Sequence, residues 1–351
     1  MQLPGNAPNN GWYNVLSDPA PARRVSGTVR APWVVLGGGL TGLSAARQLA
    51  THFPNEEIVL IEAERVGFGT SGRNSGFALD NFFQGDEVPF VDPELAKSQM
   101  RLCTGGLNLL RKLVKENDIE CGWHDWGKLH VSAGPDGAMG LEGLKKGYEM
   151  LDKEIQELNH DEVEAVTGSK FYTAGLKSKG TALMNPAALC RGLGDTLPPN
   201  VTLYENTPVH RLERGQQKRL LTTNGEVVTD QLILCTNVFS PALGFAKSDM
   251  VPIVAFASLT RPMTALEQVE ISGDSNGFGL LPTTHGGSTV RRTPDSRILV
   301  RNTWGYGLKD VSHPALLARA QANHIDSIKK RWPKFQDFEM GLEIEHTWGG
   351  V

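Results

Sequence analysis

The first 62 residues alternate short apolar runs with an amphipathic stretch. An apolar run at residues 33–36 leads into three glycines, an Ala/Leu-rich stretch follows over residues 41–51, and a second apolar run occupies residues 58–61. Runs of four apolar residues are typical of strands buried on both faces, and the stretch between them has the composition of a helix. The order of strand, glycine turn, helix and strand predicts an α/β fold with a parallel sheet, and the rest of the chain an α+β part.

The remainder of the chain carries both helical and strand patterns. Apolar residues at helical spacing predict three further helices, and Asn185 followed by Pro186 marks the start of a fourth. Beyond Pro252 the pattern changes to short segments that predict an antiparallel sheet. The expected helices cover residues 93–117, 135–158, 186–197 and 314–332; the expected strands cover residues 128–132, 201–204, 209–212, 220–223, 226–228, 231–235, 254–259, 278–281, 288–292, 298–302 and 343–348, with a hairpin turn at 293–296.

A chain of 351 residues is long enough for two domains with separate cores. We expect a nucleotide-binding domain built from two separated stretches, with the substrate side formed by the segments between and after them. The expected organisation is an N-terminal arm at 1–30, nucleotide-binding parts at 31–92 and 181–250, a helical insertion on the substrate side at 93–180, an antiparallel substrate domain at 251–340, and the start of a C-terminal nucleotide-binding segment at 341–351.

The glycines after the first strand indicate a site for a dinucleotide. Gly37 and Gly39 have no side chains that would block a pyrophosphate, and Gly42 lets the following helix pack closely on the strand. The start of that helix presents free amide groups and a positive dipole end to phosphates. Glu62, at the end of the next strand, can accept hydrogen bonds from ribose hydroxyls and would repel a 2'-phosphate, so NADP is disfavoured while FAD and NAD both remain open. The alternative is a glycine turn in a parallel sheet without a ligand.

A second glycine-rich segment follows at residues 65–76, with the sequence Arg-Val-Gly-Phe-Gly-Thr-Ser-Gly-Arg-Asn-Ser-Gly. It contains too many glycines for a regular element and is too long for a simple turn. We expect this segment to cross beneath the bound dinucleotide.

Composition and charge exclude several classes of function. The chain is 40% hydrophobic and 21% charged, as in a globular enzyme, and its net charge of −4 gives no electrostatic case for nucleic acid. No apolar run approaches the roughly 20 residues that span a bilayer, and no leader peptide is visible, so we expect a cytoplasmic protein without membrane insertion. The four cysteines, Cys103, Cys121, Cys190 and Cys235, form no close pair, which predicts neither a disulfide framework nor a metal site.

These motifs together resemble the FAD-dependent amine and amino-acid oxidoreductases, the family of D-amino-acid oxidase, glycine oxidase and sarcosine oxidase, and most of all its gamma-glutamylputrescine oxidase branch. The most specific part is the run at residues 67–76, and Asn185-Pro186-Ala187, Thr207-Pro208-Val209, Leu234-Cys235-Thr236-Asn237 and His346-Thr347-Trp348-Gly349-Gly350 recur in the family's order. The resemblance implies a Rossmann-like FAD-binding domain of the glutathione-reductase type and an antiparallel substrate domain.

The resemblance also implies which residues hold FAD. Gly37, Gly39 and Gly42 would bind the pyrophosphate, Glu62 the adenosine ribose, and Val209 the adenine through its backbone. Thr236 and Asn237 would lie beside the phosphates. Ser71, Asn74, Ser75 and Gly76 would line the ribityl chain and the flavin ring, while Leu40, Thr41, Ala63, Thr70, Gly349 and Gly350 would add further contacts. Arg73 would either touch the pyrophosphate or brace its own loop.

In the reaction that the resemblance implies, a carbon bound to nitrogen gives a hydride to the flavin, water hydrolyses the imine, and dioxygen is reduced to hydrogen peroxide. No obligatory catalytic base is expected. Arg291, Arg292 and Arg301 lie on neighbouring strands of the expected sheet, and any that faces inward could bind a substrate carboxylate; the alternative is that they are exposed sheet residues. Trp304 and Tyr306 are candidates for the walls of the substrate pocket.

Several alternatives remain open at this stage. The same cofactor could pass electrons to a quinone or carrier protein, or the chain could bind FAD without activity, and an NAD-dependent dehydrogenase would leave residues 67–76 without a purpose. The family pattern continues beyond the Trp-Gly-Gly motif, whereas this chain ends at Val351, so we expect a truncated sequence that holds FAD weakly. His285 reads as a loop residue and His346 as a packed one. The substrate, a small amine or amino acid, and the oligomeric state are not fixed by the sequence.

Overall fold

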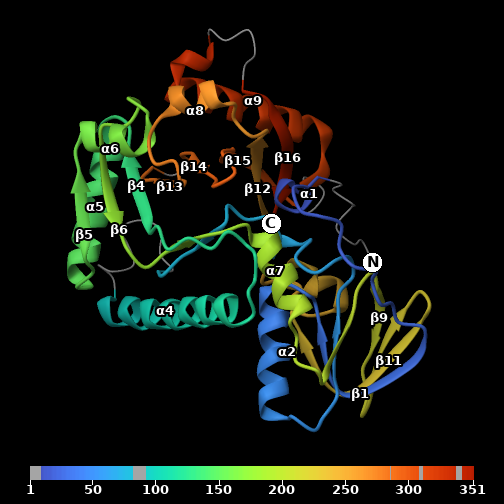
Figure 1. Ribbon diagram of the computed structural model, residues 1–351. Helices are drawn as coiled ribbons and strands as arrows, with labels where there is room; N and C mark the ends of the chain where they lie inside the picture. Colours follow the sequence, from blue (N-terminus) through green and yellow to red (C-terminus); the bar gives the residue numbers. More distant parts are fainter. Residues whose placement is uncertain (1–8, 82–91, 285, 308–310, 337–341) are drawn as a thin grey trace.

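A computed structural model describes residues 9–81, 92–284, 286–307, 311–336 and 342–351, which form two sheets with helices packed on them (Figure 1). The first sheet has six strands, and its four parallel strands adjoin an antiparallel pair. In spatial order the strands are β8 (Val201–Tyr204), β2 (Ile58–Ile61), β1 (Gly27–Leu36), β11 (Gly225–Leu234), β10 (Lys218–Thr222) and β9 (Val209–Glu213). The predicted parallel sheet is therefore confirmed.

Helices α2 (Leu40–His52) and α7 (Pro186–Asp195) cover one face of this sheet. Along β1, Val35 points into the core beneath α2, whereas Val34 and Leu36 point into the core on the other face. Alternation of this kind requires apolar residues at every position, which explains the unbroken apolar run of the central strands. The sheet places the carboxyl ends of β1, β2 and β11 at one edge, beside the start of α2.

The second sheet has eight strands and contains the predicted antiparallel part. Its neighbours pair antiparallel except β13 with β4, which run parallel. In spatial order the strands are β16 (Ile344–Gly350), β12 (Ile253–Thr260), β15 (Ile298–Tyr306), β14 (Thr289–Arg292), β13 (Phe278–Pro282), β4 (Lys128–Ser132), β6 (Ala174–Ser178) and β5 (Ile155–Leu158). The stretch expected to be a helical insertion thus supplies three strands to the same sheet.

Side chains on the two faces of the eight-stranded sheet differ in chemistry. The face toward α9 (Pro314–Arg331) is apolar and contributes Leu129, Leu280, Val290 and Val300 to a buried core. The opposite face carries polar residues at alternating positions of β4, β14 and β15, namely Lys128, His130, Thr289, Arg291 and Arg301. One face therefore stabilises the sheet, and the other presents charged groups toward the rest of the molecule.

Two predicted elements are wrong in extent. The helix expected at residues 135–158 ends as α5 (Pro135–Met150), because Asp152 adopts a positive φ of 53° and residues 155–158 then pair with β6 as strand β5. The expected strands at 226–228 and 231–235 are one strand, β11, which pairs with β1 through the polar residues between them.

The expected arm at residues 1–30 is also more ordered than its composition indicated. Residues 27–30 begin β1, where they pair with residues 225–228, and Gly11–Asn14 form the short helix α1. Helices α4 (Pro93–Glu116), α6 (His160–Thr167) and α8 (Ala265–Ile271), the short strands β3 (Phe77–Ala78) and β7 (Ala182–Leu183), and the 3-10 turns η1 (Thr70–Gly72), η2 (Asn237–Leu243) and η4 (Pro333–Gln336) complete the described elements.

Candidate functional site

The glycine turn between β1 and α2 is packed too tightly for any other residue. Gly37 has a φ of 112°, and a Cβ atom there would lie 2.5 Å from the carbonyl oxygen of Cys235. A Cβ on Gly42 would lie 1.8 Å from the carbonyl oxygen of Gly37. The backbone of the turn therefore lies bare at the start of α2, the arrangement that lets amide groups approach a pyrophosphate.

Glu62 fixes the glycine turn from the end of β2. One carboxylate oxygen accepts a hydrogen bond from the Gly38 amide at 2.6 Å, and the other accepts one from the Glu64 amide at 3.0 Å. Burial raises the pKa of Glu62, while these backbone hydrogen bonds oppose the rise. Each carboxylate oxygen keeps further acceptor capacity for a ribose hydroxyl. The Thr207 amide donates to the Glu62 carbonyl at 3.0 Å. This contact brings the start of β9, where Val209 lies, near Glu62 in space.

The serine-rich bend at residues 67–76 lies against the glycine turn. The Leu40 amide at the start of α2 donates to the Ser71 hydroxyl at 3.0 Å, and a Cβ on Gly39 would lie 2.8 Å from that hydroxyl oxygen. Within the bend, a Cβ on Gly72 would lie 1.8 Å from the carbonyl oxygen of Gly67. The two glycine-rich segments, 30 residues apart in sequence, thus form one continuous surface.

Side chains from distant elements hold the bend by its carbonyl groups. The Asn10 amide group donates to the Gly72 carbonyl at 3.0 Å, and the Trp12 indole donates to the Asn74 carbonyl at 2.8 Å. From β16, the Trp348 indole donates to the Arg73 carbonyl at 3.0 Å. Because these donors come from residues 10–12 and from β16, the conformation of the bend depends on segments near both ends of the chain.

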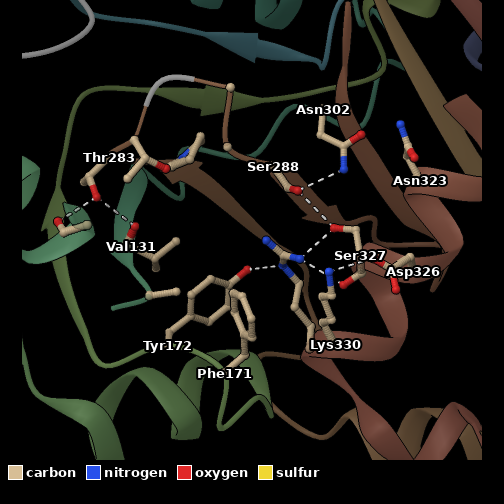
Figure 2. Close-up of a pocket in the computed structure, with 17 residues that line it drawn as sticks. Val131, Phe171, Tyr172, Thr283, Ser288, Asn302, Asn323, Asp326, Ser327 and Lys330 are labelled. Atoms are coloured by element: carbon tan, nitrogen blue, oxygen red, sulfur yellow. Dashed lines mark hydrogen bonds and ion pairs between the residues drawn. The ribbon is translucent and has the colours of Figure 1, made fainter. Parts of the chain in front are cut away.

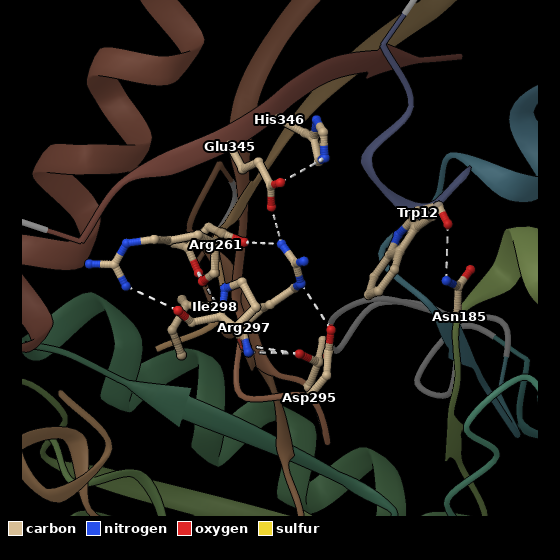
Figure 3. A network of polar contacts seen from close by, with 11 residues as sticks. Trp12, Asn185, Arg261, Asp295, Arg297, Ile298, Glu345 and His346 are labelled. Carbon is tan, nitrogen blue, oxygen red and sulfur yellow. Dashed lines mark hydrogen bonds and ion pairs between the residues drawn. The ribbon is translucent and has the colours of Figure 1, made fainter. Parts of the chain in front are cut away.

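The elements that carry these indoles are themselves fixed (Figure 3). Asn185 caps α7 through its side-chain oxygen, and its amide nitrogen donates to the Trp12 carbonyl at 3.0 Å. Beside β16, Arg297 pairs with Asp295 at 2.9 Å and also with Glu345, which lies on β16 itself. The ion pairs connect β16 with the β14–β15 hairpin on the other side of β12, and the cap anchors Trp12 to α7.

Two buried arginines brace the bend. Arg73 donates to the carbonyl groups of Phe68 at 2.8 Å, Asn9 at 3.2 Å and Gly349 at 3.1 Å. Burial lowers the pKa of Arg73 to about 10, which leaves it charged at neutral pH. Of the two roles expected for Arg73, bracing its loop is the one that these contacts show.

Arg291 corrects an expectation from the sequence. Its Nη1 atom donates to the carbonyl groups of Ser75 at 2.9 Å, Gly76 at 2.8 Å and Met184 at 2.8 Å, and the side chain is 2% exposed. Burial lowers the pKa of Arg291 to about 9. A guanidinium committed to three carbonyl groups in this way positions the bend and does not act as a free ligand for a substrate carboxylate.

The other expected cofactor residues lie around the same turn. Thr236 and Asn237 follow β11. The carbonyl group of Cys235, directly after this strand, lies against Gly37. Asn237 has a φ of 46° and begins η2. A Cβ on Gly350 would lie 3.0 Å from the Cβ of Arg73, so β16 ends against the bend. Leu40 and Thr41 begin α2, Ala63 follows Glu62, Thr70 begins η1, and Asn74, Ser75 and Gly76 end the bend. Contacts of these residues with a cofactor stay a prediction.

A cavity of about 200 Å³ lies on the polar face of the eight-stranded sheet. We call it the β4–β15 cavity, and its walls include Leu79, Asn81, Lys128, His130, Arg301 and Trp304. Leu79 and Asn81 follow the bend in the chain, so the wall of the cavity continues directly from residues 67–76. No Asp or Glu is found among the described residues that line it. The cavity is therefore the concave space best placed for a substrate.

Arg301 is the expected substrate residue that this cavity contains. No hydrogen bond or ion pair of its guanidinium is found with the residues that the structure describes, and its Nε atom is buried without a partner. The guanidinium carbon lies 5.0 Å from the centre of the Trp304 ring. Burial lowers the pKa of Arg301. A half-buried guanidinium of this kind gains most from a carboxylate that enters the cavity.

The remaining substrate-side candidates lie elsewhere. Tyr306 is 75% exposed at the end of β15 and is not among the residues that line this cavity, which agrees with a surface position. Arg292 points to the opposite face, where it donates to the Ser272 carbonyl at 2.7 Å. His346 lies 3.9 Å from Glu345. His285 lies outside the described residues.

A second cavity, of about 430 Å³, lies between the sheet and α9 (Figure 2). Its lining residues Val131 and Asn302 alternate with His130 and Arg301 along their strands, so it opens on the opposite face. Its polar groups bind one another: Ser288 lies 3.0 Å from the Ser327 hydroxyl and accepts from Asn302 at 3.1 Å. This cavity is separated from the bend by the sheet itself.

Replacing Trp12 with phenylalanine tests the bracing of the bend. The change removes the indole donor of the Asn74 carbonyl but keeps the ring. Loss of a hydrogen bond of this kind costs about 1 kcal/mol, so FAD should bind roughly fivefold more weakly by fluorescence titration. The matched control is Trp33→Phe, which removes an indole hydrogen bond to Glu56 far from the bend. Equal losses in the two variants would contradict the bracing role.

The glycine turn, the acidic strand end and the bend packed against the turn are features of an oxidoreductase fold of the dinucleotide-binding class. The sequence pattern described as DAO, FAD dependent oxidoreductase, matches residues 32–351, and the chain belongs to this family. Family, fold class and FAD as the cofactor are thereby confirmed. The bare turn and the acceptor oxygens of Glu62 fit an FAD molecule.

Curated relatives match most of the chain. Gamma-glutamylputrescine oxidoreductase of Escherichia coli K12 is 24% identical over 344 residues, which cover 94% of this chain and 76% of the relative. A probable oxidoreductase OrdL of Rhizobium meliloti is 26% identical over 356 residues, which cover 98% of this chain and 78% of the relative.

Solved structures share the fold at lower identity. Glycine oxidase from Geobacillus kaustophilus aligns with a TM-score of 0.68 at 17% identity, covering 92% of this chain and 82% of the other. L-proline dehydrogenase from P. horikoshii aligns with a TM-score of 0.69 at 16% identity, covering 92% and 81%. The FAD-bound, dithionite-reduced L-alpha-glycerophosphate oxidase from Mycoplasma pneumoniae has a TM-score of 0.68 at 17% identity, covering 92% and 82%.

Across the part of the chain that the structure describes, no helix has both the length and the apolar character needed to cross a bilayer.

Proposed function

We propose that the chain oxidises the carbon–nitrogen bond of a small amine or amino acid that carries a carboxylate, with dioxygen as the electron acceptor. The observation that carries this proposal is the guanidinium of Arg301 in the β4–β15 cavity, for which the described part of the chain supplies no hydrogen-bond or ion-pair partner. The relative gamma-glutamylputrescine oxidoreductase and the structural neighbour glycine oxidase support an amine or amino acid as the substrate.

We assign the cofactor to the surface formed by the two glycine-rich segments. Gly37, Gly39 and Gly42 would hold the pyrophosphate, Glu62 the adenosine ribose, and residues 71–76 the flavin end. When bound, FAD accepts the hydride that the substrate carbon loses as its bond to nitrogen becomes an imine. The tight packing of the turn and the bracing of the bend keep this surface rigid. The protein therefore needs little rearrangement to orient the reacting carbon of an incoming substrate.

The chain's own residues orient the substrate and exclude water. Arg301 would bind the carboxylate through its planar fork, which leaves the amine and its neighbouring carbon on the side of the cavity toward the bend. Burial and the charges of Lys128 and Lys153 lower the pKa of His130 to about 3, so this histidine is neutral at physiological pH. Hydride transfer from a neutral amine requires no strong base, in agreement with the chemistry of this cavity.

The electron acceptor distinguishes the proposed oxidase from a dehydrogenase. Both kinds of enzyme occur among proteins with this fold, since glycine oxidase and L-proline dehydrogenase both align with the chain. The test is a panel of amines and amino acids mixed with the FAD-loaded chain, first without oxygen and then in air. We expect a carboxylate-bearing amine to bleach the flavin band anaerobically and to yield one peroxide per turnover in air. Bleaching without peroxide would indicate a dehydrogenase, and no bleaching by any member would contradict the proposed activity.

A further inference from the structure

A buried cluster of charged side chains adjoins the β4–β15 cavity at β4, on the side of the cavity opposite β15. Lys128, which is fully buried on β4, donates to Asp80 at 2.7 Å and also to Asn81. Asp80 further binds Lys153 and accepts from the Thr181 hydroxyl at 3.0 Å. Although burial acts in the opposite direction, the two ammonium groups hold the pKa of Asp80 below its ordinary value.

Among the described residues, the cluster pairs two lysines with a single carboxylate. Asp80 is ionised and faces two lysines, so the three side chains carry a net charge of +1 while both lysines are protonated. Burial lowers the pKa of Lys128 to about 8, which leaves it mostly protonated at pH 7. An excess charge in a buried place is costly unless an anion compensates it. The described groups around the cluster offer no second carboxylate: His130 is neutral, and the neighbouring ring of Tyr148 lies 5.7 Å from the Lys128 nitrogen.

Lys128 reaches the cavity with donor capacity remaining. An ammonium group has three donor hydrogens, and Asp80 and Asn81 take two of those of Lys128. Lys128 and His130 both line the β4–β15 cavity, and the Nδ1 atom of His130 is buried without a partner in the described part of the chain. The cavity therefore has two separate positive positions, Arg301 on β15 and Lys128 on β4, with β13 and β14 between their strands.

We propose that the substrate of this site is a dicarboxylic amine, with one carboxylate bound by Arg301 and the second bound by Lys128 and His130. This inference rests on the proposed function and narrows its substrate class. A polyamine without a carboxylate would place a further positive charge in a cavity that already has an excess, so such substrates are disfavoured. A zwitterionic monocarboxylate would satisfy Arg301 alone and leave Lys128 uncompensated.

The test measures binding rather than turnover. The FAD-loaded chain is titrated by calorimetry with succinate, glutarate and adipate, and with butyrate, pentanoate and hexanoate of matching chain lengths. We expect the best dicarboxylate to bind about 10- to 100-fold more tightly than its monocarboxylate partner, because a hydrogen bond to a charged group is gained. Equal affinities within every pair would overturn the proposal, even in a chain that oxidises other amines.

Two substitutions with different pH dependence identify Lys128 as the cause. Lys128→Met should reduce the preference for dicarboxylates to nearly one at every pH, whereas Asp80→Asn removes the carboxylate that raises the pKa of Lys128, so it should reduce the preference at pH 7 and restore it at lower pH. Structural damage alone would weaken dicarboxylates and monocarboxylates together in both variants. The matched control is Lys145→Met, which removes a lysine that pairs with Glu157 on the outside of α5. A preference that survives Lys128→Met in a folded, FAD-loaded chain would refute the assignment.

Discussion

Gly72→Ala should release FAD from the protein, whereas Gly69→Ala should leave FAD bound. The added methyl group at Gly72 would lie 1.8 Å from the carbonyl oxygen of Gly67, and no flexible side chain can move away to make room. At Gly69, three residues earlier in the same bend, an added Cβ meets no atom within 4 Å. Overpacking against rigid neighbours costs about 1–3 kcal/mol or more, which corresponds to a loss of FAD affinity of roughly 10- to 100-fold.

The measurement is the FAD dissociation constant of each purified variant, with its thermal unfolding midpoint as a check on the fold. We expect Gly72→Ala to unfold a few degrees earlier than the parent and Gly69→Ala to match the parent. The account of the bend as half of the cofactor site would be wrong if Gly72→Ala folded normally and kept its flavin.

Arg301→Met should reduce kcat/KM for a carboxylate-bearing amine by about 30- to 5,000-fold, since removal of one partner of a buried charge pair costs about 2–5 kcal/mol. The loss should fall mainly on KM, because the carboxylate interaction is made equally before and during the reaction. Methionine retains much of the length and apolar contact of the arginine stem. Arg301→Lys keeps the charge but loses the planar fork, so it should be intermediate.

The comparison that isolates the guanidinium uses a second substrate in the same variant. An amide or ester of the best substrate lacks the carboxylate charge, and its kcat/KM should be similar in the parent and in Arg301→Met. Arg211→Met, on the exposed surface of β9, is the matched arginine control. Equal losses for the charged and uncharged substrates would show that Arg301 shapes the cavity and does not bind a carboxylate.

Much of the fold was predictable because its signals are local. The glycine turn, the cap and proline at Asn185 and Pro186, and the apolar runs of β1 and β2 each depend on a few neighbouring residues. Two helices were missed although they had such a signal, since Asn159 with Glu162 and Thr264 with Glu267 form capping boxes at the starts of α6 and α8. The excess length of the expected helix at 135–158 arose because β5 continues the same apolar spacing.

The division of roles between Arg291 and Arg301 could not be predicted from the sequence. The two arginines lie on neighbouring strands and on the same face of the sheet, and each follows a valine and precedes a polar residue. Carbonyl groups of Ser75, Gly76 and Met184, more than 100 residues away, occupy Arg291, while no described group occupies Arg301. Contacts of this kind depend on the tertiary structure. Lys128 did have a local signal, because it alternates with apolar residues in a buried strand.

Hydrogen–deuterium exchange, with and without FAD, most directly tests whether the glycine turn and the bend together hold the flavin. We predict that FAD slows amide exchange both at residues 37–42 and at residues 69–76, because ligand binding suppresses local opening where it makes contact. ADP, which lacks the flavin half, should slow exchange mainly at the first of these segments. Slower exchange at residues 37–42 with no change at residues 69–76 in the presence of FAD would contradict the account.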